Sequence, residues 1–292
     1  MTWTASAMRL SVAAVCAAVV AVSCGDDAAQ NDSTPVTEAV ATTTLLATPS
    51  TADTGPLSLV AIGDSIPNNA ASDCPGCTGF VDQYAAALEE ATGRPVTTTN
   101  LSQHNGLTLP RLMAELGDFR DELSGADAII VGIAHNSIEL GSDHPCGGTL
   151  DPSTNLPADW TLITDACAAA SSAEYRPMFD ELYSTIAGWR EGEPTLLLTI
   201  NKYSDWLGWT AGHLTPEQDE RTVMLHDAWN AMLCESAIAN GFECVDIYHA
   251  FNGPDGTTPS GDLLARDYVH ASQAGNDLIA QELISAGFDA LA

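Results

Sequence analysis

Three residues whose types could together activate a hydroxyl group lie far apart along this chain. Ser65 stands in LVAIGDSIPNN, where an apolar run ends at Gly63 and leaves the serine at its exit. Asp267 and His270 lie three residues apart near the other end. A serine attacks an acyl carbon when an imidazole takes its proton and a carboxylate orients that ring. The residues therefore indicate acyl transfer, although Gly63 and Ser65 also suit an ordinary strand-to-loop turn.

The hydropathy pattern predicts the elements that would position these residues. Short apolar runs predict five strands, at residues 57–62, 95–102, 126–134, 194–201 and 242–248. Segments with helical spacing follow them, at residues 80–93, 109–123, 173–191, 215–240 and 272–287. This alternation predicts a three-layer αβα sandwich with a central, mostly parallel five-stranded sheet. Ligands bind beyond the carboxyl ends of such strands, so the loops that follow the five strands should converge on one rim.

Four sequence blocks fall on that rim in chain order. Ser65 lies in GDS, Gly106 in NLSQHNGLT, Asn136 in IAHNS, and Asp267 with His270 in DYVHASQAG. In this order the chain resembles the SGNH (GDSL-type) hydrolase family over residues 57–292. The resemblance implies that family's flavodoxin-like fold and a carboxylic ester hydrolase that needs neither metal nor organic cofactor.

The resemblance also assigns roles residue by residue. Ser65 would be the nucleophile, His270 the general base and then the general acid, and Asp267 the carboxylate that holds the imidazole. The backbone N–H of Ser65, together with Gly106 and Asn136, would form the oxyanion hole. Each such donor is worth about 3 to 4 kcal/mol in a comparable site.

The chain departs from the family pattern in three places. The third block reads AHNS where the family has GxND, so only Asn136 is retained, and the second block is loose, with His104 shortly before Gly106. The DxxH pattern also occurs twice, since Asp246 and His249 fit it as well. We expect Asp246 to be a structural carboxylate, because it falls within the predicted strand at 242–248.

Six cysteines lie beyond the N-terminal region and predict disulfides in an exported domain. Six cysteines allow 15 pairings. Local pairing is predicted, as Cys74–Cys77, Cys146–Cys167 and Cys234–Cys244. The CxxC spacing leaves one alternative open, a zinc site built from Cys74, Cys77, His144 and Cys146.

The N-terminal region reads as a targeting segment. An apolar stretch at residues 10–22 is short for a membrane span and is followed by small residues, which predicts a signal peptide at 1–24. Its end resembles the bacterial lipobox, which makes Cys24 a lipidation candidate, with simple cleavage and full secretion as the alternative. Residues 25–56 are rich in Thr, Ala and Pro and predict a disordered tether. Residues 57–292 suffice for one hydrolase domain.

Charge limits the partners. With 39 acidic residues against nine Lys plus Arg, the formal net charge is −30. Nucleic acid is therefore excluded as an expected partner, and the membrane is expected only through an N-terminal lipid anchor. We expect a monomer in the cell envelope or secreted.

The expected substrate is an acyl ester: a short-chain ester, an acetylated glycan or a lipid. Trp206 and Trp209 follow the fourth predicted strand and could form a wall of the substrate pocket or pack the next helix. A long loop predicted at 137–172 could cover the site. The alternatives are an acyltransferase that uses the same site and a non-catalytic ligand-binding lipoprotein that retains the fold.

Overall fold

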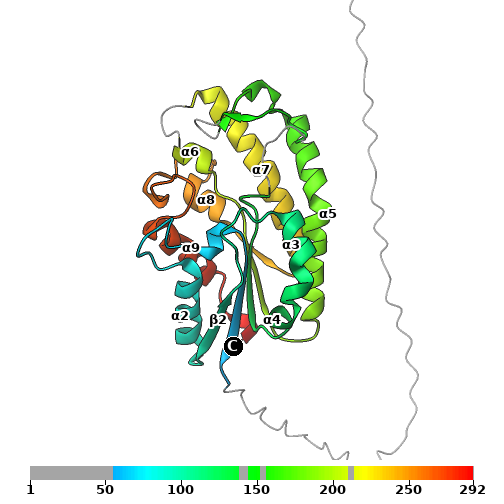
Figure 1. Ribbon diagram of the computed structural model, residues 1–292, viewed down its shortest axis with the longest axis vertical. Helices are drawn as coiled ribbons and strands as arrows, with labels where there is room; N and C mark the ends of the chain where they lie inside the picture. The colour runs from blue at the N-terminus through cyan, green and yellow to red at the C-terminus, as the bar shows by residue number, and fades with distance from the viewer. Residues whose placement is uncertain (1–54, 138–143, 152–155, 210–213, 292) are drawn as a thin grey trace, which may run out of the picture. The chain divides into compact units, whose positions relative to one another are not determined.

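The computed structural model describes residues 55–137, 144–151, 156–209 and 214–291. Its centre is one five-stranded sheet (Figure 1). The strands are β1 (Leu57–Gly63), β2 (Val96–Asn100), β3 (Ala128–Gly132), β6 (Leu196–Ile200) and β7 (Glu243–Val245). Their spatial order is β2-β1-β3-β6-β7, and every neighbouring pair is parallel. This confirms the predicted sheet.

Helices cover both faces of the sheet (Figure 1). One face carries α3 (Leu109–Glu115), α4 (Arg120–Ser124), α5 (Asp165–Trp189) and α7 (Pro216–Ala239). The other carries α2 (Phe80–Thr92), α8 (Ile247–Asn252) and α9 (Gln273–Ser285). Strand β1 alternates between them: Val60 and Ile62 pack into the first core, and Leu59 and Ala61 into the second. A strand buried on both faces reads as a continuous apolar run for this reason.

Shorter elements connect these layers. They are α1 (Ser65–Asn68), α6 (Asp205–Trp209), the small antiparallel pair β4 (Leu150–Asp151) and β5 (Leu156–Pro157), and the 3₁₀ turns η1 (Leu116–Phe119), η2 (Trp160–Leu162), η3 (Gly261–Leu263) and η4 (Asp289–Leu291). The predicted helix at 109–123 is thus divided into α3, η1 and α4.

The strand order fixes where a ligand can bind. Counted within the sheet alone, the order is 2-1-3-4-5, which is that of flavodoxin-like folds. The chain leaves β1 toward one edge of the sheet and returns to β3 on its other side. The crevice that results lies at the carboxyl ends of β1 and β3. Gly63 ends β1 and Gly132 ends β3, so Ser65 and Asn136 follow directly at that crevice.

Two sequence-based predictions need correction. Strand β7 ends at Val245, and Asp246 caps the N-terminus of α8 by accepting the His249 N–H, so it is not a strand residue. The region 137–172 is not one long loop, because it holds β4, β5, η2 and the start of α5. Helix α5 begins at Asp165, eight residues before the predicted start at 173, and Thr164 caps it. The small residues of its first turns hide the apolar period there. Residues 138–143 and 152–155 of this region lie outside the described residues.

The six cysteines form the three disulfides predicted by local pairing. Cα–Cα distances are 5.5 Å for Cys74–Cys77, 4.7 Å for Cys146–Cys167 and 5.2 Å for Cys234–Cys244. The alternative zinc site is therefore wrong, since the sulfur atoms that zinc would need as thiolates are bonded to each other.

The predicted signal peptide, the tether up to residue 54 and Cys24 lie outside the described residues. Within the described part of the chain, no helix combines the length and apolar character needed to cross a membrane.

Gly63 provides a test of how tightly β1 and β3 approach. A Cβ at this position would lie 1.9 Å from the carbonyl oxygen of Gly132, a backbone atom that cannot move aside alone. We expect Gly63→Ala to lower the free energy of unfolding by about 3 kcal/mol or more, measured by urea denaturation. Gly188→Ala is the matched control, because Gly188 is exposed on α5 with no atom within 4 Å. It should gain about 0.5 to 1 kcal/mol. Equal stabilities of the two variants would contradict the close approach.

Candidate active site

Ser65 lies on a short capped turn at the end of β1. It is the first residue of α1, and Asp64 caps that helix by accepting the Ile66 N–H through Oδ1 at 3.0 Å. Asn69, with φ of 50°, ends the helix after one turn. Ser65 is 9% exposed. The GDS tripeptide thus combines a close strand contact, a cap and a fixed hydroxyl.

The structure brings together the three residues singled out first in the sequence. His270 Nε2 lies 2.9 Å from Ser65 Oγ, and His270 Nδ1 lies 2.7 Å from Asp267 Oδ2. The other oxygen of Asp267 accepts the backbone N–H groups of Val269 and His270, at 3.0 and 3.1 Å. The backbone of this DxxH turn therefore fixes the Asp267 carboxylate against the His270 ring.

Electrostatics keep Asp267 ionised. Burial alone would raise the pKa of Asp267, but the hydrogen bonds from the His270 ring and from the two backbone N–H groups outweigh it and hold that pKa below its ordinary value. An ionised carboxylate on Nδ1 fixes the His270 tautomer that carries its lone pair on Nε2, facing Ser65.

The second DxxH pair has the same local geometry in another place. Asp246 Oδ2 lies 2.6 Å from His249 Nδ1, and Asp246 Oδ1 accepts from the Asn201 side chain at 2.8 Å. The His249 ring also packs against Tyr248. His270 Nε2 lies within hydrogen-bond distance of Ser65 Oγ, so the structure brings the pair at 267 and 270 to the serine.

One buried carboxylate connects the nucleophile turn to the loop after β3. Asp64 is fully buried, and its Oδ2 accepts the His135 N–H at 3.0 Å while Oδ1 caps α1. Burial raises the pKa of Asp64 to about 6, opposed by the Ile66 N–H, the charge of Lys202 and the N–H groups of His135 and Asn136. The turn at Ser65 and the segment at Asn136 are therefore held by the same group.

Lys202 holds that segment from the other side. It is the only lysine in the chain, it is 5% exposed, and its Nζ donates to the His135 carbonyl at 3.0 Å. The Asn230 amide bonds both backbone groups of Lys202 at 2.9 Å. The peptide between His135 and Asn136 thus donates to Asp64 and accepts from Lys202. Lys202 is not among the candidates expected from the sequence, although a single lysine just after a predicted strand at this rim is a visible signal.

The remaining sequence candidates lie as follows. Gly106 is on an exposed turn with φ of 68°, and the start of its block is tied to β1 by Gln103 N–H donating to the Gly63 carbonyl at 2.9 Å. Trp206 is 7% exposed and packs edge-on against Trp160, so it belongs to the core, as its helix-packing interpretation predicted. The side chain of Trp209 lies outside the described residues.

Two residues that sequence reasoning did not place in the site adjoin His270. Asp73 Oδ2 lies 3.5 Å from His270 Nε2, and Asp73 Oδ1 lies 3.1 Å from His104 Nε2. Asp73 also borders a cavity of about 590 Å³. The cavity is lined mainly by the loop before α9 and by the first disulfide loop: Asp73, Cys74, Pro75, Gly261, Asp262, Leu264, Ala265, Arg266, Tyr268 and Ser272. The position of Asp73 along the sequence gives no sign that it lies beside His270.

Comparison with known proteins decides the family. A model of the GDSL-like lipase/acylhydrolase family matches residues 61–278. The chain belongs to this family. As a GDSL-like lipase/acylhydrolase of the SGNH type, it is an esterase or lipase.

Solved structures share the fold of this GDSL-like protein. The lipase Lip_vut3 from a goat rumen metagenome is 17% identical with a TM-score of 0.58, over 81% of this chain and 100% of its own. An extracellular lipase from Streptomyces rimosus is 18% identical with a TM-score of 0.54, over 79% and 100%. At these identities the likeness shows the fold alone. No curated protein matches the sequence.

Lys202 gives a pH-dependent test of the buried charges. Lys202→Met removes the cation that lowers the pKa values of buried Asp64 and Asp205. Leaving these carboxylates uncompensated should cost about 3 to 5 kcal/mol of unfolding free energy at pH 8. Because the folded-state pKa of each is raised, the variant regains stability as falling pH protonates them, so the loss should shrink by pH 5.

The control is Arg176→Met, which breaks an exposed ion pair with Glu235 and should cost less than about 1 kcal/mol at both pH values. Urea denaturation of the three proteins at pH 5 and pH 8 makes the comparison. An equal loss for Lys202→Met at the two pH values would show that its charge is not what stabilises the site.

Proposed function

We propose that the protein hydrolyses carboxylic esters through a covalent acyl-serine at Ser65. The observation that carries the proposal is the continuous hydrogen-bonded chain from Ser65 Oγ through the His270 imidazole to Asp267, with distances of 2.9 and 2.7 Å. In a family of lipases and esterases, this chain supplies the nucleophile, the base and the orienting carboxylate that acyl transfer needs.

The proposed reaction has two halves. His270 Nε2 takes the Ser65 proton while Oγ attacks the acyl carbon, and the protonated imidazole then gives that proton to the leaving alcohol oxygen. In the second half a water molecule takes the alcohol's place, His270 accepts its proton, and the acid leaves as Oγ is protonated again. The ionised Asp267 stabilises the imidazolium in both halves.

The proposed oxyanion hole combines Ser65, Gly106 and Asn136. The peptide that leads into Asn136 is held by Asp64 and Lys202, which supports a fixed position for this residue. Donors that are already fixed need no reorganisation when the negative charge develops. The retained asparagine of the AHNS segment would thus serve without the rest of the family pattern.

The proposed setting is outside the cytoplasm. Three disulfides in a domain of this size support export, because they persist in oxidising compartments. Lipid attachment at Cys24 remains part of the proposal. The proposed substrate is a short-chain ester, an acetylated glycan or a lipid ester, and the cavity beside Asp73 has the volume of a small-ligand pocket.

The test is hydrolysis of p-nitrophenyl esters from acetate to palmitate by the wild type and three variants. Ser65→Ala and His270→Ala should each lower kcat/KM by at least about a thousandfold, because each removes one member of a concerted unit. His249→Ala is the matched control: it removes the histidine of the other DxxH pair and should retain activity within about twofold.

The chain-length profile then separates the substrate classes. Preference for acetate would favour short acyl groups, and preference for palmitate would favour lipid esters. Full activity of Ser65→Ala, or activity lost in His249→Ala and kept in His270→Ala, would overturn the assignment, provided that circular dichroism shows all three variants folded.

A further inference from the structure

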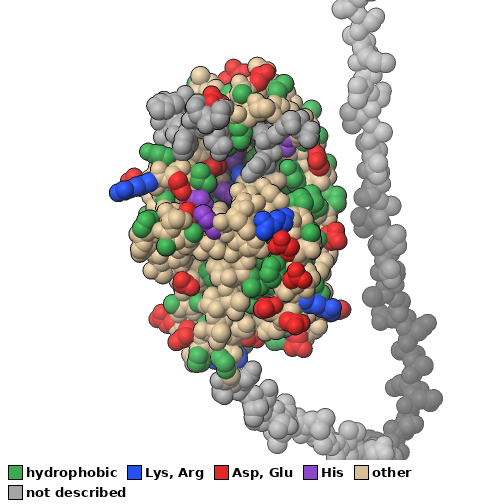
Figure 2. Space-filling view, viewed as in Figure 1, with side chains coloured by type: hydrophobic (Ala, Val, Ile, Leu, Met, Phe, Trp, Pro, Cys, Tyr) green, Lys and Arg blue, Asp and Glu red, His purple; other side chains and the backbone are tan. Residues whose placement is uncertain are grey.

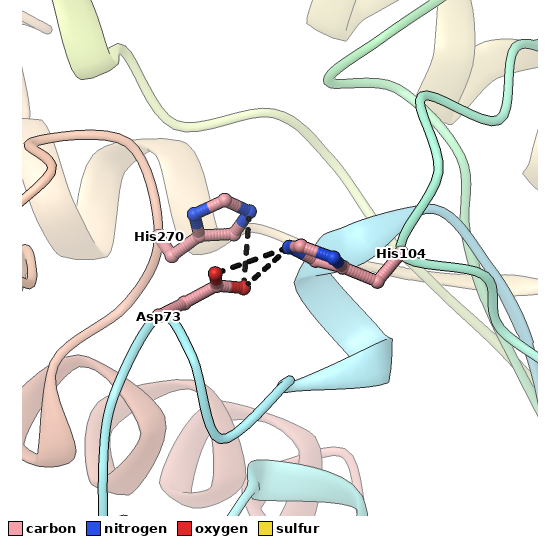
Figure 3. Close-up of side chains that lie close together, drawn as sticks. All are labelled: Asp73, His104 and His270. Carbon is pink, nitrogen blue, oxygen red and sulfur yellow. Dashed lines mark hydrogen bonds and ion pairs between the residues drawn. The ribbon is translucent and has the colours of Figure 1, made fainter.

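Three side chains converge on one point beside Ser65. One of them, His270, belongs to the hydrogen-bonded chain from Ser65 to Asp267, and the other two do not. Asp73, His104 and His270 come from three separate segments and aim their polar atoms toward one another (Figure 3). The ligand atoms of the three residues all lie within 4.8 Å of each other. Histidine side chains also lie close together on the face shown in Figure 2.

We propose that Asp73, His104 and His270 form a binding site for one first-row divalent cation such as Zn²⁺, which on binding His270 Nε2 reversibly blocks the enzyme. The inhibitory part rests on the proposed function of His270, whereas cation binding does not. Two imidazoles and a carboxylate are a ligand set suited to zinc and related ions.

The two distances from Asp73 to the imidazoles are close to those between ligands of such an ion. Ligand atoms about 2.0 to 2.1 Å from a tetrahedral Zn²⁺ lie about 3.4 Å apart. Asp73 Oδ2 lies 2.9 Å from His104 Nε2 and 3.5 Å from His270 Nε2. Shifts of about half an ångström in these side chains would bring both distances to the value expected between the ligands of a tetrahedral ion.

The protonation state that catalysis needs is also the one that binds metal. With its Nδ1–H donated to Asp267 at 2.7 Å, His270 presents the Nε2 lone pair. A carboxylate on the other ring nitrogen is the usual outer partner of a metal-binding histidine, because it fixes the ring and raises its basicity. Asp267 would therefore orient His270 for a cation as it does for Ser65.

Asp73 presents a buried carboxylate oxygen to the two imidazoles. Its side chain is 10% exposed, and among the described residues Oδ2 accepts no hydrogen bond of good geometry despite lying between two imidazoles. His104, with a side chain 40% exposed, leaves the point open to solvent. The net charge of −30 raises the local concentration of cations at such an opening.

Binding at this point would stop the proposed reaction. Ser65 Oγ lies 2.9 Å from the same nitrogen that the cation would occupy. A metal bound to Nε2 takes the lone pair that must accept the serine proton. No covalent change is involved, so a chelator should restore activity fully.

The experiment titrates protein without a polyhistidine tag with ZnCl₂ by isothermal calorimetry, beside inhibition of ester hydrolysis and reversal by EDTA. His104→Gln is the decisive variant, because it removes one ligand at an exposed position. His249→Gln is the matched control, since Asp246 and His249 offer one carboxylate and one imidazole 2.6 Å apart, and among the described residues they belong to no three-ligand cluster.

We expect the wild type and His249→Gln to bind one Zn²⁺ with equal affinity and to be inhibited over the same concentration range. Each protein's metal-free rate serves as its own reference, and relative to it His104→Gln should need far more Zn²⁺ for inhibition than the wild type. It should bind Zn²⁺ at least about 100-fold more weakly, because losing even an outer partner of a metal ligand costs about 10- to 100-fold in affinity. Stoichiometric binding that produces no esterase inhibition would overturn the inhibitory part of the inference.

Zn²⁺ binding that is absent from the wild type, or that is lost in His249→Gln and kept in His104→Gln, would overturn the site itself. A protein that binds one Zn²⁺ through His104 but hydrolyses no ester would leave the cation site standing and refute the proposed function. The calorimetric and kinetic measurements thus separate the two failures.

Discussion

The arrangement of the site depends on one carboxylate that is removed from water. Asp64 is fully buried, and a charge in that position is tolerated only when donors and a cation replace its hydration. The donors come from both sides of the crevice: Ile66 on the nucleophile turn and His135 on the loop after β3. The cation is Lys202, from the loop after β6. Three neighbouring strands are therefore bound together just where their carboxyl ends meet.

The base reaches this crevice from the last part of the chain, so its position depends on long-range contacts. Tyr203 donates its hydroxyl to the Val269 carbonyl at 2.7 Å and thus holds the DxxH turn from behind. The first turn of α9 is tied to the start of α2, where Asn276 Oδ1 accepts the Phe80 N–H at 3.0 Å. These bonds set the position of His270 relative to Ser65, which lies 205 residues earlier.

What could be predicted from the sequence follows the range of the interactions. The parallel sheet was predictable because each strand is a local apolar run, and the order of the four blocks placed Ser65 and His270 on one rim. The end of β7 was not predictable, because Asp246 caps a helix although the hydropathy of its segment suits a strand. The start of α5 was hidden by its small residues and is set by the Thr164 cap.

The parts of the site that could not be predicted are those that arise only on folding. Asp73 approaches His270 because the loop closed by the Cys74–Cys77 disulfide lies beside the turn that carries His270. No spacing along the chain encodes that contact. The role of Lys202 depends on the Asp64 carboxylate and the His135 carbonyl, which follow two other strands. From the sequence, Trp206 could equally have lined a pocket or packed in the core. Its ring contacts with Trp160 and His226, which form only on folding, place it in the core.

The central claim is that Ser65 becomes acylated, and trapping that intermediate tests it most directly. Folded protein would be labelled with a fluorophosphonate or quenched in acid during turnover of a p-nitrophenyl ester, then digested and mapped by mass spectrometry. The account predicts one adduct per chain, on the peptide that contains Ser65, and none when His270 is replaced by alanine. An adduct on another residue, or rapid ester hydrolysis with Ser65 unmodified under both procedures, would contradict it.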